Sequence, residues 1–83
     1  METIVPGSVL MVGKDEQIPA VASAIRPGRV EVVYLDMSGR ALHQEVSWRK
    51  GAWEFIEGAQ GGRTADRNAR LEQYVKMLRV LTV

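Results

Sequence analysis

The sequence predicts a mainly β domain with a C-terminal α-helix, in which five strands form a small barrel or a strongly bent antiparallel meander sheet. Glycine and proline interrupt the first two thirds of the chain at short intervals and leave short β-rich runs between them. After the glycine-rich segment that follows, apolar residues recur at helical spacing. With 83 residues and no cysteine, the chain has room for one small core, which packing alone must hold together.

We expect the strands at residues 8–12, 20–26, 29–36, 41–48 and 52–56. Pro27-Gly28 is typical of a tight turn, because proline fixes φ at its first central position and glycine accepts a positive φ at the next. Ser38-Gly39 suits a two-residue hairpin loop, and Gly51 suits the left-handed position of a three-residue loop. The strands therefore follow one another as a meander of hairpins.

A helix is predicted over residues 65–79. Its apolar stripe consists of Leu71, Tyr74, Val75, Leu78 and Leu81. Thr64 is the expected N-cap, and the pairs Asp66/Arg70 and Glu72/Lys76 have i,i+4 spacing. We expect a single domain, with a β-barrel over 1–57, a glycine-rich connector over 58–63, and over 64–83 a helix that packs on the barrel or on a partner.

A two-residue turn at 38–39 would place Tyr34 opposite His43 and Leu35 opposite Leu42. The face expected to form the barrel interior then holds Val33, Leu35, Leu42, Val46, Trp48 and Ile56. The other face holds Val30, Val32, Tyr34, His43, Glu45, Ser47, Trp53 and Phe55. This second face is too apolar to stay exposed, so the helix, a second copy of the chain or a partner protein is expected to cover it.

The order of these elements resembles the SH3-like small β-barrel superfold, which includes Tudor and KOW-type domains. The resemblance covers residues 5–57 and rests on the five short strands, the turn Pro27-Gly28 before the strand at 30–34, and the pair Trp48 and Trp53. It implies a barrel and no specific family, and such barrels bind peptides, modified side chains and nucleic acids. The chain lacks the Ala-Leu-Tyr-Asp-Tyr segment and the adjacent tryptophans of signalling SH3 domains, which argues against binding of proline-rich peptides.

No motif indicates an enzyme, a cofactor or a metal site. Gly7 to Lys14 lacks the spacing of a phosphate-binding loop, and His43-Gln44-Glu45 lacks the paired cysteines that complete a deaminase zinc site. The N-terminus has no basic leader, and its early apolar run is too short for a signal or a membrane span. We therefore expect a cytoplasmic, non-enzymatic protein without metal or membrane contact.

The first functional hypothesis is an interaction module that binds a protein partner or itself through the aromatic sheet face, the C-terminal helix or both. Its candidate residues are Tyr34, Trp53, Phe55, Leu71, Tyr74 and Leu78. The alternative is weak RNA or DNA binding through Arg26, Arg29, Arg40, Arg49, Lys50 and Arg70. A net charge of +1 gives no strong field, although residues 1–57 carry an excess of about two negative charges and residues 58–83 an excess of about three positive charges.

Overall fold

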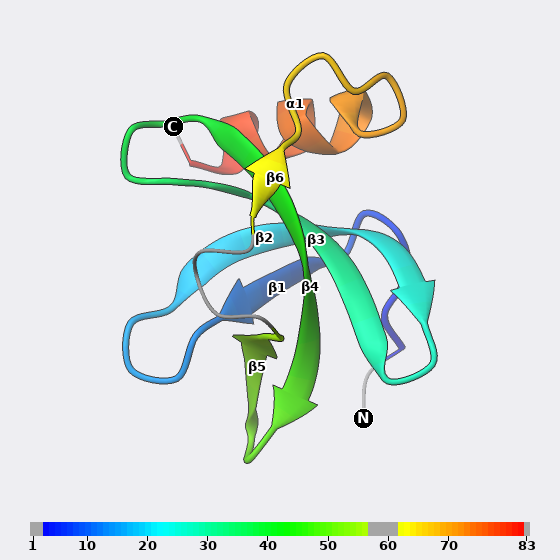
Figure 1. Cartoon of the computed structure of the whole chain (residues 1–83), viewed down its shortest axis with the longest axis vertical. Coiled ribbons are helices and arrows are strands. Elements are labelled where there is room, and N and C mark those ends of the chain that lie inside the picture. The colour runs from blue at the N-terminus through cyan, green and yellow to red at the C-terminus, as the bar shows by residue number, and fades with distance from the viewer. Residues whose placement is uncertain (1–2, 57–61, 83) are drawn as a thin grey trace.

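The computed structural model describes residues 3–56 and 62–82, which form a closed five-stranded barrel with a helix across its outside (Figure 1). The elements are β1 (Val9–Val12), β2 (Ile18–Arg26), β3 (Arg29–Leu35), β4 (Ala41–Arg49), β5 (Ala52–Phe55), β6 (Arg63–Thr64) and α1 (Glu72–Leu81). The predicted fold class, a mainly β SH3-like small barrel with a C-terminal helix, is confirmed.

The barrel closes through a chain of antiparallel neighbours and one parallel contact. Each of β1 to β4 pairs antiparallel with the next strand, and Val12 of β1 pairs parallel with Trp53 of β5. Gly13 donates its amide to the Trp53 carbonyl at 2.8 Å beside that closure. The short strand β6, which was not predicted, pairs antiparallel with β4. It includes Arg63 of the predicted connector, whose residues 58–61 lie outside the described part of the chain.

Two of the hairpin loops show how local sequence sets the meander. Gly28 has the positive φ that the predicted Pro27-Gly28 turn requires. Between β4 and β5 the loop has two residues rather than the expected three, because Lys50 and Gly51 both adopt positive φ, of 50° and 84°. Consecutive positive φ values match the twist of the flanking strands and keep Arg49 directly opposite Ala52.

The predicted register of β3 and β4 is wrong by one residue. The loop between them contains residues 37–39, because Asp36 donates its amide to the Arg40 carbonyl at 2.9 Å and accepts the Arg40 amide on Oδ1, also at 2.9 Å. Tyr34 consequently lies opposite Leu42, and Val33 lies opposite His43. Since side chains alternate between the faces of a strand, this shift mixes the two predicted faces.

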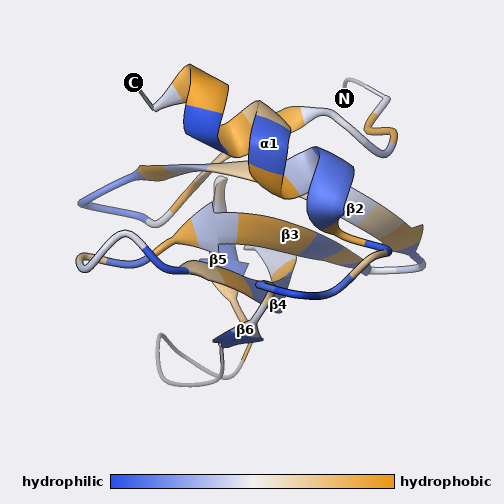
Figure 2. Cartoon of the chain, turned by 90° about the horizontal axis from the view of Figure 1, so that it is seen from above, coloured by the Kyte–Doolittle hydropathy of each residue, from blue (hydrophilic) through white to orange (hydrophobic). Residues whose placement is uncertain are grey.

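The apolar residues form two clusters, one inside the barrel and one outside it. The interior cluster contains Leu10, Val12, Ala20, Ala22, Val30, Val32, Tyr34 and Val46, with Ile4, Ile18, Leu42, Trp53 and Phe55 packed against them. The outer cluster contains Val21, Val33, Ala41, Ala65, Leu71 and Leu78, with Leu35, Tyr74 and Val75 at its border. Val33 and Leu35, predicted to lie inside the barrel, thus belong to the surface that α1 covers (Figure 2).

The helix starts later than predicted, at Glu72, and Thr64 lies in β6 instead of at a helix N-cap. Residues 66–71 form turns, in which Arg67 takes a left-handed φ of 65° that interrupts a helix. The predicted Glu72/Lys76 pair is present at 3.3 Å. Arg70 does not pair with Asp66, because its guanidinium binds a carboxylate of the barrel.

Candidate functional site

The six predicted protein-binding residues lie in two separate places. Tyr34, Trp53 and Phe55 belong to the barrel interior, where the Tyr34 and Phe55 ring centroids are 4.9 Å apart. The Tyr34 hydroxyl donates to Gln44 Oε1 at 3.0 Å, and burial raises the pKa of this phenol. Leu71, Tyr74 and Leu78 belong instead to the outer cluster between α1 and the sheet. The barrel wall separates the two groups, so they do not form one surface.

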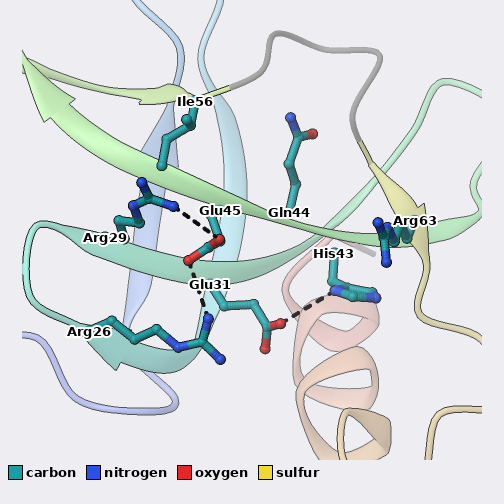
Figure 3. Close-up of a pocket in the computed structure, with 8 residues that line it drawn as sticks. All are labelled: Arg26, Arg29, Glu31, His43, Gln44, Glu45, Ile56 and Arg63. Atoms are coloured by element: carbon teal, nitrogen blue, oxygen red, sulfur yellow. Dashed lines mark ion pairs between the residues drawn. The ribbon is translucent and has the colours of Figure 1, made fainter.

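A charged groove of about 270 Å³ lies on the outside of the barrel, next to the part of the sheet that α1 covers (Figure 3). Its lining residues are Arg26, Arg29, Glu31, His43, Gln44, Glu45, Ile56 and Arg63. They come from the end of β2, the start of β3, the middle of β4, the residue after β5, and β6. We call this the arginine groove.

Two carboxylates form the floor of the arginine groove. Glu31 and Glu45 are directly opposite each other on β3 and β4, an arrangement that is unfavourable for two like charges. At one end of the groove, Arg26 Nη1 lies 3.5 Å from Glu45 Oε2 and Arg29 Nη1 lies 3.7 Å from Glu45 Oε1 (Figure 3). These distances are long for charge-assisted hydrogen bonds, so the two guanidiniums neutralise Glu45 without being tightly held by it.

Glu31 is tied more firmly, because it is 9% exposed and three side chains surround its carboxylate. Arg70 donates from Nη1 to Oε1 at 2.7 Å and from Nη2 to Oε2 at 3.2 Å. The Ser23 hydroxyl donates to Oε1 at 2.7 Å, and His43 Nδ1 lies 3.4 Å from Oε2. The hydrogen bonds from Arg70 lower the pKa of Glu31 against the opposing effect of burial. Glu31 thereby links the barrel to the segment that leads into α1.

The six cations predicted to bind nucleic acid do not form one continuous surface. Arg26 and Arg29 line the arginine groove, and Arg70 is beside it on Glu31. Arg40 lies 3.6 Å from Asp36 in the β3–β4 loop. Arg49 and Lys50 are at the β4–β5 turn.

Sequence reasoning missed Arg63 as a site residue. It belongs to the segment taken for a connector, and a single arginine after two glycines carries no pattern that indicates a strand. Its placement depends on pairing with a distant strand, since Arg63 is the cross-strand neighbour of His43.

The arrangement of Ser23, Glu31 and His43 does not form a catalytic triad. The Ser23 hydroxyl donates to the carboxylate rather than to the imidazole, so no base is placed to activate it. Among residues 3–56 and 62–82, no group of three or more histidine, cysteine, aspartate or glutamate side chains could hold a metal ion. No helix in the described part of the chain has the length and apolar character needed to span a membrane.

A second exposed feature is apolar. Val9 and Met11 of β1 are 49% and 45% exposed, and Met77 of α1 is 40% exposed. Val9 lies opposite Val21 of the outer cluster, so the side chains of β1 border the covered part of the sheet. We call these three residues the apolar strip.

Comparisons of the chain with protein-family models, with curated proteins and with solved structures found no match. The function of the chain is therefore inferred from the chemistry of the arginine groove and of the apolar strip.

Proposed function

We propose that this chain is a non-enzymatic interaction module that binds an acidic segment of a partner protein in the arginine groove. The observation that carries the proposal is the convergence of Arg26, Arg29 and Arg63, from three different strands, on one groove. All three side chains are exposed, so a ligand can reach them without displacing the core.

The composition of the groove favours a peptide over a nucleic acid. Among the described residues, the side chains that line the groove include no tryptophan, tyrosine or phenylalanine, whereas single-stranded nucleic acids are held largely by stacking of bases on aromatic rings. The carboxylates of Glu31 and Glu45 would repel a continuous phosphate backbone. A peptide can direct its carboxylates to the arginines and place its neutral backbone over the glutamates.

Fluorescence anisotropy with a labelled hexaglutamate peptide tests this proposal. We expect the peptide to bind. Arg29→Gln should weaken binding several-fold, because the groove loses one of its three arginines. Arg49→Gln removes the same charge at the β4–β5 turn, so it should leave the affinity nearly unchanged.

Equal losses in the two variants, or no binding by the unmodified chain, would overturn the groove proposal. A mixed-sequence RNA or DNA strand that binds more tightly than the peptide, with steep loss of affinity as salt rises, would favour the nucleic-acid alternative.

Self-association is a second candidate function, and the apolar strip favours it. Three large apolar side chains exposed next to a covered apolar cluster are a feature of interaction sites. Sedimentation velocity over a wide concentration range should show a dimer that Met11→Glu abolishes, because a charge in the centre of an apolar contact is costly to bury. A monomer at all concentrations contradicts this candidate and leaves the groove proposal intact.

A further inference from the structure

We infer that the Arg63–His43 end of the arginine groove is the anchor site for a carboxylate group of the bound peptide, an assignment that rests on the proposed function. The carboxylate belongs either to an acidic side chain or to a free C-terminus, since both present the same planar pair of oxygens.

The arginines at the groove differ in their ion-pair partners. Arg26 and Arg29 share Glu45, and Arg70 holds Glu31. Arg63 makes no ion pair or hydrogen bond through its side chain with the residues that the structure describes. Among the described residues, the charge of Arg63 therefore has no direct partner, whereas Arg26 and Arg29 share the single carboxylate of Glu45.

The backbone of Arg63 is held in a fixed position. Arg63 pairs with His43, Thr64 pairs with Leu42, and the Ala65 amide donates to the Ala41 carbonyl at 2.8 Å. Because residues 63–65 are all held by β4, the Arg63 side chain extends from a fixed point of the backbone. Preorganisation of this kind reduces the entropic cost of binding a ligand.

The neighbour of Arg63 in the groove is His43. The imidazole of His43 is held by its Nδ1 beside Glu31, and Figure 3 shows it at the same end of the groove as Arg63. With Nδ1 as the donor to Glu31, the other ring nitrogen accepts in the neutral imidazole and donates only in the doubly protonated form. A guanidinium can bind both oxygens of a carboxylate, and a doubly protonated imidazole can add a further hydrogen bond.

The test uses the full chain and two labelled peptides: hexaglutamate with an amidated C-terminus, and hexaglutamine with a free C-terminus. Arg63→Gln should lower the affinity for whichever peptide supplies the carboxylate by about tenfold. This is the effect of losing one charge-assisted interaction. Arg63→Lys should give an intermediate loss, because lysine keeps the charge and cannot bind both oxygens in a fork. Arg67→Gln is the matched control, since Arg67 is an exposed arginine outside the groove with no ion pair among the described residues.

The outcomes distinguish failure of the proposed function from failure of the anchor assignment alone. If the unmodified chain binds neither peptide, the proposed function fails and this assignment fails with it. If the peptide binds and Arg29→Gln weakens it while Arg63→Gln has no more effect than Arg67→Gln, the groove proposal stands and the anchor assignment is overturned. A larger effect of Arg63→Gln on a phosphorylated peptide than on either carboxylate peptide also overturns it.

Discussion

Replacing Leu78 with alanine is expected to lower the free energy of unfolding by about 2–5 kcal/mol. Leu78 is 0% exposed and lies in the outer cluster between α1 and the sheet, so the change removes buried methyl groups and leaves a cavity. A domain of this size has a total stability of roughly 4–12 kcal/mol, so the variant should lose a large fraction of its stability and unfold at a clearly lower urea concentration. Urea denaturation followed by tryptophan fluorescence measures the change.

The control for this variant is Val80→Ala on the same helix. Val80 is 75% exposed, so its truncation should change stability by less than about 0.5 kcal/mol. If Leu78→Ala costs no more than Val80→Ala, then α1 does not pack on its own barrel in solution. That result would instead support the hypothesis that the helix is free to bind a partner.

Replacing Glu31 with glutamine is expected to cost about 1–3 kcal/mol at neutral pH. Glutamine keeps the shape of the side chain, but Arg70 loses its bidentate partner and His43 loses its neighbouring charge. Because folding lowers the pKa of Glu31, its charge stabilises the fold fully above the unfolded value of 4.5. The contribution disappears as the pH falls through the lower folded pKa, so the stabilities of the two proteins should converge in acid.

Chemical denaturation at several pH values measures this convergence. Glu72→Gln is the matched control, because Glu72 forms an exposed pair with Lys76 and should have little effect at any pH. A double-mutant cycle with Arg70→Gln should give a clear coupling energy between Glu31 and Arg70. Additive effects of the two substitutions, or a pH-independent difference from the unmodified protein, would contradict the role assigned to Glu31.

The elements that could be predicted from the sequence are those with local causes. Pro27-Gly28 sets its turn through the φ values that these two residues accept, and the spacing of apolar residues gives the helix. The β3–β4 register could not be predicted in this way. Asp36, Ser38 and Gly39 suit loops of two or three residues, and the bonds that Asp36 makes in the fold select the longer one.

The candidate site was less accessible to sequence reasoning, because its parts are far apart along the chain. Glu31 and Arg70 are separated by 39 positions, and no local pattern connects them. Arg63 enters the groove only through pairing of β6 with β4. Arg26 and Arg29 were identified because they flank a recognisable turn, although the sequence could not show that they share Glu45.

The most direct test of the proposed function is a titration of the isotopically labelled chain with hexaglutamate, followed by ¹H–¹⁵N correlation spectra. We expect the largest chemical-shift changes at the amides of Arg29, His43, Glu45 and Arg63, which surround the arginine groove. Changes confined to Val9, Met11 and Met77, or no changes at all, would contradict it.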